Sequence, residues 1–394
     1  MMSVAMMTNV NTADAAQPVD DGQSGAGATI LIATGGTAGH IEPALSVADA
    51  IRVIDPQVRI HFLGSRRGLE TTMIPERGYP LHVVDASPMP RGLHRGAVSA
   101  MRQIRRAARQ AGEVLDTLRP AVVVGFGGYA SAPAYLAARR RRVPVVIHEA
   151  NARPGLANRL GARRAARVLS SSSVPWAGAR HVGLPLRPTI ALLDRAALRD
   201  DARAELGIDP VRPLLLVFGG SQGARRINDA LGGALPRILD AGVDVLHLHG
   251  AANAAIPPTT DQGWPGYHAL SYLARMDLAY AAADLALCRA GAMTCGELAA
   301  VGLPAIYVPL PVGNGEQRLN ALPVVAAGGG LLIPDAELTA ERLADTALAL
   351  LGDRVRLDAM SAAAYSCGER DGDQAVADVV LEVIGELGTG GGSS

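Results

Sequence analysis

Lysine is absent from this chain of 394 residues, so all 37 of its permanently basic side chains are arginines. Aromatic residues make up only 3% of the chain, which disfavours the base stacking that single-stranded nucleic-acid binding uses. No apolar run reaches the roughly 18 residues that a membrane-spanning helix needs. The first 28 residues also lack the basic start and apolar core of a signal peptide. We therefore expect no transmembrane helix, and we expect residues 1–28 to form a disordered extension.

Metal-binding patterns are equally scarce. The chain has three cysteines, Cys288, Cys295 and Cys367. They have no metal-ligand spacing and cannot all pair, which predicts small core residues in a reducing cytosol. His148-Glu149 lacks the second histidine of a zinc-binding H-E-x-x-H motif. The D-x-D at 371–373 precedes an apolar-periodic helix, and capping of that helix explains it better than a cation site does. The sequence therefore predicts neither a metal nor a cofactor.

The residues that are abundant indicate a globular protein with uneven charge. Hydrophobic residues make up 49% of the chain and charged residues 19%, and the length suits two ordinary domains. Residues 1–186 hold 22 arginines and 12 acidic residues, whereas residues 187–394 hold 15 arginines and 25 acidic residues. A basic half and an acidic half within one neutral chain suggest that the first domain meets an anionic partner.

Both halves contain short runs rich in Val, Ile and Leu that alternate with helical periodicity, which predicts parallel sheets covered on both faces. The predicted strands are 29–33, 59–63, 121–125 and 143–148 in the first half, and 213–218, 243–249, 284–288 and 304–309 in the second. The first strand of each half leads into a Gly-Gly-(Thr/Ser)-x-Gly loop, at 35–39 and 219–223. Ligands of such sheets bind beyond the carboxyl ends of the strands. We therefore predict an α/β protein of two doubly wound Rossmann-like domains that face each other across a cleft, linked near 184–190.

The first glycine loop, ATGGTAGHIEP at 33–43, is followed by a predicted helix whose N-terminus favours an anion. Gly35, Gly36 and Gly39 are expected to form the turn, and Pro43 suits the helix's first turn. His40 is not needed for any of this. A side chain that titrates near neutral pH beside an anion site suggests proton transfer. The alternative is that His40 only caps the turn.

A second candidate anion site follows the predicted strand 284–288. Residues 291–294 would present backbone N–H groups to a diphosphate at a helix start. Glu297, expected in the first turn, could accept hydrogen bonds from ribose hydroxyls, or it could form a capping box with Thr294. Further on, Gln317 and Asn320 share one helical face, and their amides suit sugar hydroxyls. Taken alone, they also fit an ordinary polar helix start.

A basic amphipathic helix is predicted within residues 91–110, which contain six arginines and no acid. Four of them share one stripe, Arg102, Arg105, Arg106 and Arg109. Such a helix favours contact with anionic lipid at a membrane surface. Nucleic acid is the alternative, although no aromatic residues interleave with these arginines, and an ordinary solvated face is also compatible with the pattern.

A dinucleotide dehydrogenase is the main rival on residue patterns alone. Its fingerprint is G-x-G-x-x-G with an acid at the end of the second strand. Here Thr34 replaces the first glycine and the second strand ends without an acid. Ser65 and Arg66 could hold a 2′-phosphate, so an NADP-dependent enzyme remains a weaker alternative.

Seven motifs that run in order between residues 29 and 335 resemble those of the MurG family of peptidoglycan N-acetylglucosaminyltransferases. They are GGTAGHIEPAL (35–45), GFGGYASAP (125–133), HEANARPGLAN (148–158), GLPLR (183–187), FGGSQGARRIN (218–228), CRAGAMTCGELAAVGLPAIYVPLP (288–311) and EQRLNA (316–321). The resemblance implies a GT-B fold. Residues 29–185 would form an acceptor- and membrane-binding domain, 186–370 a UDP-GlcNAc-binding domain, and 371–394 a helix that packs back on the first domain, with a flexible tail.

The resemblance also implies the reaction and its partners. Family members transfer GlcNAc from UDP-GlcNAc to the MurNAc 4-hydroxyl of lipid I, which makes lipid II, with inversion and without a catalytic metal. The expected location is the cytoplasmic face of the bacterial membrane, as a peripheral protein beside other cell-wall synthesis proteins. A UDP-GlcNAc epimerase of the same fold and an inactive UDP-sugar-binding scaffold are the alternatives.

Residue roles follow from the same resemblance. The residues expected near GlcNAc and the acceptor are Thr37, Ala38, Gly39 and Asn151, and those expected near the nucleotide and diphosphate are Arg187 and Ser221. Tyr272 and Leu273 are expected at the uracil, Ala292, Met293 and Thr294 near phosphate and sugar, Glu297 at the ribose, and Gln317 and Asn320 at the GlcNAc hydroxyls. His40 is the favoured general base and Glu149 its rival. The chain departs from the family at Ala38, often glycine, and at Glu316, where some members have an amide.

Overall fold

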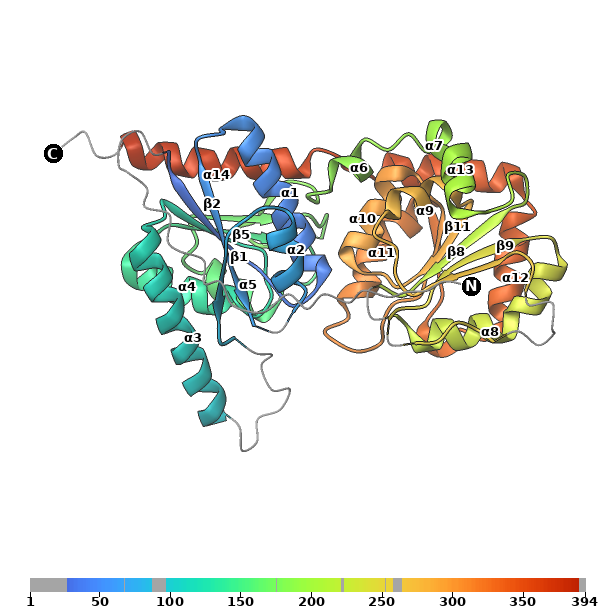
Figure 1. The fold of residues 1–394 in the computed structure, drawn as a ribbon, viewed down its shortest axis with the longest axis horizontal. Helices are drawn as coiled ribbons and strands as arrows, with labels where there is room; N and C mark the ends of the chain where they lie inside the picture. The colour runs from blue at the N-terminus through green and yellow to red at the C-terminus, as the bar shows by residue number, and fades with distance from the viewer. Residues whose placement is uncertain are drawn as a thin grey trace, which may run out of the picture.

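Two parallel sheets, each covered by helices on both faces, form two domains side by side (Figure 1). The computed structural model describes residues 27–66, 68–86, 97–174, 176–220, 223–251, 253–257 and 264–389. The predicted α/β class with two doubly wound domains is confirmed, because the strand orders are β3-β2-β1-β4-β5-β6-β7 and β10-β9-β8-β11-β12-β13. In both sheets the chain order reverses beside the first strand, which is where ligands of such sheets bind.

The first sheet and its helices run from residue 29 to residue 181. The elements are β1 (Thr29–Ala33), α1 (Ala38–Ile54), β2 (Arg59–Ser65), α2 (Glu70–Glu76), β3 (Leu81–Val84), α3 (Ala97–Leu118), β4 (Val122–Gly125), α4 (Ser131–Arg141), β5 (Val145–Glu149), α5 (Leu156–Ala162), β6 (Arg167–Ser170) and β7 (Arg180–His181). In β1, Ile30 and Ile32 pack toward α1, whereas Leu31 and Ala33 pack toward α4. The strand is apolar throughout because both of its faces are buried.

The second sheet follows a short linker. The elements are α6 (Pro188–Ala191), α7 (Arg195–Leu206), β8 (Leu214–Phe218), α8 (Arg225–Asp240), β9 (Asp244–Leu248), β10 (Tyr267–Leu270), α9 (Met276–Ala282), β11 (Leu285–Cys288), α10 (Ala292–Val301), β12 (Ala305–Tyr307), α11 (Glu316–Ala326), β13 (Gly330–Leu332), the 3-10 turn η1 (Asp335–Glu337), α12 (Ala340–Leu351) and α13 (Arg354–Ser366). The linker ends at Arg187, the residue that precedes α6.

The last helix, α14 (Gly372–Thr389), returns to the first domain and lies along α1 (Figure 1). Its valines at 376, 379, 380 and 383 are buried in the same core cluster as Ile30 and Ile32. The chain therefore crosses between the domains twice, once at the linker and once before α14. No helix of the described residues is both long and apolar enough to cross a membrane.

Five strands were not predicted from the sequence: β3, β6, β7, β10 and β13. Each has two to four residues, and β7 and β10 are at least partly exposed along their whole length. Strands this short carry too few apolar positions for a period of two to stand out. The predicted core strands agree with the structure to within two residues at each end.

Candidate functional site

The first glycine turn places His40 in the opening turn of a helix. Gly35 and Gly36 have φ values of 142° and 96°, which only glycine adopts without strain. α1 then begins at Ala38, with Thr37 as an extended residue before it. Because the first N–H groups of a helix have no partner within it, this end of α1 can donate to an anion or a polar substrate.

The sequence-based account of this turn is wrong in two details. Gly39 lies within α1 and does not have a positive φ, so the turn depends on Gly35 and Gly36 alone. Pro43 is the sixth residue of α1 and not part of its first turn. Both errors arise because the helix starts earlier than the proline suggests.

Glu70 fixes the glycine turn by a hydrogen bond from the Gly36 N–H. This residue was not singled out from the sequence. Its side chain is fully buried and accepts hydrogen bonds from the backbone N–H groups of Gly36 (2.9 Å) and Ser65 (3.0 Å) and from the Ser65 hydroxyl (2.6 Å). Arg66 pairs instead with Asp85 at 2.8 Å. The proposed 2′-phosphate site at Ser65 and Arg66 is therefore wrong, because a phosphate there would face the Glu70 carboxylate. The NADP alternative loses its only support.

The His40 ring faces the loop that follows β4. It lies against Gly127, where a methyl group would come within 3.2 Å of the ring, and Asn158 lies beside the same spot. Burial lowers the pKa of His40 below 6.5, and the Glu149 carboxylate and the Phe126 backbone carbonyl oppose that shift. The imidazole is therefore neutral at pH 7 and able to accept a proton.

The Glu149 carboxylate is already saturated with hydrogen bonds. Its side chain sits at the end of β5 and is 3% exposed. One oxygen accepts from the backbone and side-chain N–H groups of Asn151 (3.0 and 3.1 Å), and the other accepts from the Gly155 N–H (2.9 Å) and the Asn158 amide (3.0 Å). A carboxylate with all of these bonds shapes its own loop, and it has little capacity left to accept a proton from a substrate.

Arg187 lies where the two domains meet. Its guanidinium is 3.6 Å from a carboxylate oxygen of Glu42 in α1 and 3.7 Å from one of Glu297 in α10. Tyr280 donates a hydrogen bond to the other oxygen of Glu297 at 2.7 Å. Burial raises the pKa of Glu297, and the Arg187 charge opposes that shift. The structure thus brings together two residues that were predicted to contact the donor, Arg187 and Glu297.

The start of α10 differs from the predicted capping box. Gly291 is the residue before the helix, and Thr294 makes no capping bond. Glu297 is the sixth residue of α10, in its second turn. Ala292, Met293 and Thr294 are half-buried in the first turn, where free N–H groups are available to an anion. The capping-box alternative is therefore wrong.

Gln317 and Asn320 use their amide oxygens within the protein. Gln317 accepts from the backbone N–H groups of Ala290 (3.2 Å) and Leu310 (2.9 Å), both in its own domain. Asn320 accepts from the Ala152 N–H (2.9 Å) and donates to the Asn151 side-chain oxygen (3.3 Å), both in the first domain. Asn320 therefore links the two domains beside the loop that Glu149 shapes.

The two residues expected to contact the uracil, Tyr272 and Leu273, differ in how far they are packed against the protein. Tyr272 is 64% exposed, in the loop after β10, whereas Leu273 packs partly against the core of the second domain. Ser221 lies outside the described residues.

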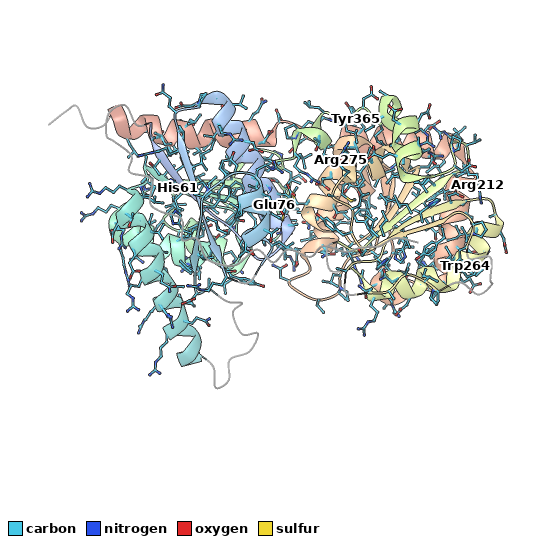
Figure 2. All side chains as sticks on the ribbon, viewed as in Figure 1. His61, Glu76, Arg212, Trp264, Arg275 and Tyr365 are labelled. Carbon is cyan, nitrogen blue, oxygen red and sulfur yellow. The ribbon has the colours of Figure 1, made fainter. Side chains whose placement is uncertain are left out.

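The four predicted membrane-facing arginines lie elsewhere, on α3. Side chains extend outward along this helix, which projects from the first domain (Figure 2). All four arginines are exposed, and two of them have acidic neighbours: Arg106 pairs with Asp85 (3.0 Å) and Arg109 with Glu113 (4.0 Å). Arg102 and Arg105 are exposed on the same helix.

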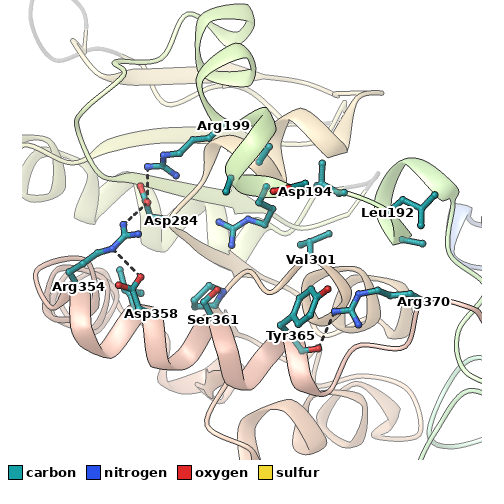
Figure 3. Close-up of a pocket in the computed structure, with 17 residues that line it drawn as sticks. Leu192, Asp194, Arg199, Asp284, Val301, Arg354, Asp358, Ser361, Tyr365 and Arg370 are labelled. Carbon is teal, nitrogen blue, oxygen red and sulfur yellow. Dashed lines mark hydrogen bonds and ion pairs between the residues drawn. The ribbon is translucent and has the colours of Figure 1, made fainter.

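A cavity of about 670 Å³ lies apart from these residues, on the second domain beside α7 and α13 (Figure 3). Among the arginines that line it, Arg199 and Arg354 pair with Asp284, whereas Arg195 and Arg370 bind backbone carbonyls at the ends of helices. Arg195 donates to the carbonyls of Tyr280, Ala283 and Gly302, and Arg370 donates to those of Tyr365, Gly368 and Ala300. Arg195 and Arg370 thus neutralise helix C-termini, and none of the predicted site residues lines this cavity. No group of three or more potential metal ligands occurs among the described residues.

Comparison with known proteins gives a consistent result. Residues 30–170 match the glycosyltransferase family 28 N-terminal domain and residues 214–376 its C-terminal domain. A Mycobacterium sp. (strain JLS) protein is 54% identical over 363 residues, which cover 92% of this chain and 97% of the relative. A Mycobacterium tuberculosis (strain ATCC 25177 / H37Ra) protein is 55% identical over 383 residues, covering 94% and 93%. Both are named UDP-N-acetylglucosamine--N-acetylmuramyl-(pentapeptide) pyrophosphoryl-undecaprenol N-acetylglucosamine transferase.

Two solved structures place the fold. The crystal structure of Acinetobacter baumannii MurG is 27% identical and covers 90% of this chain and all of its own, with a TM-score of 0.69. A putative UDP-N-acetylglucosamine 2-epimerase from Listeria monocytogenes is 16% identical, covers 90% and 95%, and has a TM-score of 0.63. At that identity the second likeness concerns the fold alone.

Proposed function

The chain belongs to the family of UDP-N-acetylglucosamine–N-acetylmuramyl-(pentapeptide) pyrophosphoryl-undecaprenol N-acetylglucosamine transferases, and from this premise we propose that it transfers GlcNAc from UDP-GlcNAc to lipid I and so forms lipid II. The observation that carries the proposal is the identity of 54% over 92% of the chain with a relative of that name. The epimerase alternative rests on a likeness of only 16% identity, which concerns the fold.

His40 is our choice of general base. The MurNAc 4-hydroxyl oxygen attacks C1 of GlcNAc, the bond from C1 to the diphosphate oxygen breaks, and the hydroxyl proton passes to the imidazole. Attack from the face opposite the leaving group inverts the anomeric centre. The lowered pKa of His40 keeps the ring ready to accept a proton at pH 7. Glu149 is the weaker candidate because its oxygens already accept four hydrogen bonds.

The leaving UDP needs positive charge, and the protein has two sources of it. Arg187 lies beside Glu297, the proposed ribose ligand, and α10 offers the N–H groups of its first turn at Ala292, Met293 and Thr294. Both act on the developing charge of the diphosphate without protonating it. This is why we propose that the reaction proceeds without a metal.

The first domain is the proposed acceptor and membrane side. α3 exposes Arg102, Arg105 and two further arginines on a helix that projects from that domain. Anionic headgroups attract such a helix, which would hold the protein at the cytoplasmic face of the membrane where a lipid-linked acceptor lies.

The test is a transfer assay with purified protein, UDP-GlcNAc, EDTA and a lipid I analogue, in which UDP release and glycosylated product are both measured. We expect both to depend on the acceptor and to persist in EDTA. UDP-GlcNAc turnover that needs no acceptor would favour the epimerase. Product that appears only when a divalent cation is restored would disprove metal independence.

A further inference from the structure

Arg187 is held between carboxylates of two different domains, and only one of them was predicted to be part of the site. Glu42 Oε1 lies 3.6 Å from Arg187 Nη1, and Glu297 Oε1 lies 3.7 Å from Nη2. The Arg187 side chain is 20% exposed and that of Glu42 only 15%. Both distances exceed a normal hydrogen bond. Arg187 is thus close enough to attract both carboxylates, but neither contact is a hydrogen bond.

This cluster leaves buried polar atoms unsatisfied. Arg187 Nε and Glu42 Oε2 are both buried and have no hydrogen-bond partner. A buried polar atom without a partner is rare, because its lost hydration is not replaced. The second oxygen of Glu297, in contrast, is occupied by Tyr280. The unsatisfied atoms therefore belong to the pair Arg187 and Glu42, and they indicate a polar site that a ligand completes.

The Glu42 carboxylate also lies close to a second arginine, Arg77. Arg77 Nη2 lies 3.9 Å from the second oxygen of Glu42, and Arg77 also pairs with Asp49 at 2.7 Å. Charges thus alternate from Asp49 through Arg77 and Glu42 to Arg187. Along α1, Glu42 follows His40 by two residues, so the two side chains leave the helix on different sides. One helix start presents His40 to the acceptor loops and Glu42 to Arg187.

We propose that Glu42 is a positioning residue for the donor, which holds the Arg187 guanidinium toward the diphosphate from the opposite domain. This inference rests on the proposed function, in which Glu297 accepts the ribose hydroxyls. When the ribose engages Glu297, Glu42 remains as the carboxylate that orients Arg187. A residue of the acceptor domain thereby controls the affinity for the donor.

The experiment is calorimetric titration of the full-length protein with UDP, for the wild type, Glu42→Gln, Arg187→Lys and the double variant. Glu42→Gln should weaken UDP binding roughly tenfold, since it removes one of the two carboxylate charges that face Arg187. In the Arg187→Lys background the same change should have a much smaller effect, because the fork that Glu42 orients is already gone. In transfer assays the KM for UDP-GlcNAc should rise while the KM for the lipid acceptor stays unchanged.

A matched control is Arg77→Gln, which removes a neighbouring charge of Glu42 but leaves Arg187 and Glu42 in place. It should alter UDP affinity less than Glu42→Gln does.

If Glu42→Gln leaves UDP affinity unchanged or tightens UDP binding, Glu42 merely competes with UDP for Arg187 and the inference is wrong. The same holds if the effect of Glu42→Gln is undiminished in the Arg187→Lys background. If the wild type itself binds no UDP and transfers no GlcNAc, the proposed function has failed first.

Discussion

At the scale of single residues, the proposal that His40 is the general base predicts how activity depends on pH. His40 must be neutral to accept a proton, and burial lowers its pKa below 6.5. Activity should therefore be lost as the pH falls through that lowered pKa and be constant above it. His40→Ala should reduce kcat by about 10²- to 10⁴-fold and remove this acidic limb, while UDP affinity stays the same. A pH profile of kcat/KM for both proteins checks this, and an acidic limb that survives in His40→Ala would assign it to another group.

Glu149→Gln tests the loop-shaping role. The glutamine would turn an NH₂ group toward donors that now bind the carboxylate, namely the N–H groups of Asn151, Gly155 and Asn158. We expect a loss of about 1–3 kcal/mol in the free energy of unfolding. The KM for lipid I should rise, and the acidic limb of the pH profile should remain. Thermal unfolding together with acceptor titration provides the measurement. A loss of kcat of about 10²-fold or more with an unchanged KM for lipid I would instead assign the base to Glu149.

At the scale of elements, α3 carries the prediction about the membrane. Arg102 and Arg105 are exposed, and each arginine near an anionic surface contributes about 1 kcal/mol. Changing both to glutamine should therefore weaken binding to phosphatidylglycerol vesicles roughly 30-fold, and added salt should reduce the difference between the proteins. Transfer to a water-soluble acceptor should be unaffected. Vesicle sedimentation is the measurement.

The control for this pair lies on α8, where Arg225 and Arg237 are also exposed. Changing Arg225 and Arg237 to glutamine alters the net charge by the same amount, but in the other domain. Equal losses of vesicle binding by both double variants would mean that net charge, rather than α3, governs the contact.

Elements also show how far local pattern predicts structure. The strand 29–33 was predicted without error because both of its faces are buried and its sequence is apolar throughout. β7 was missed because a strand of two exposed residues, Arg180 and His181, has no such pattern. Pro43 misled the prediction of the start of α1, since proline favours a first turn but is also tolerated deeper in a helix when the fold compensates for the lost bond.

At the scale of the whole molecule, the sequence did not predict contacts between residues that lie far apart along the chain. Arg187 and Glu297 were singled out by their own motifs. Glu42 and Glu70 were not, although Glu42 lies within the first of these motifs. Their importance depends on partners that folding supplies: Glu42 meets an arginine 145 residues away, and Glu70 meets the turn at Gly36. A local pattern records the type of a residue but not which residue from another domain will face it.

The whole-molecule prediction concerns closure of the cleft. Asn320 makes two hydrogen bonds to the first domain, with Ala152 and Asn151, and these favour the closed arrangement by about 2 kcal/mol in total. Asn320→Ala should therefore increase the radius of gyration of the free protein in small-angle X-ray scattering.

Gln317→Ala is the matched control, because the hydrogen bonds of Gln317 stay within its own domain. Both variants remove an amide proposed to read the GlcNAc hydroxyls, so both should raise the donor KM, but only Asn320→Ala should open the cleft. Scattering from Asn320→Ala that matches the wild type would show that other contacts, such as Arg153 with the Asn314 carbonyl, are sufficient to hold the domains together.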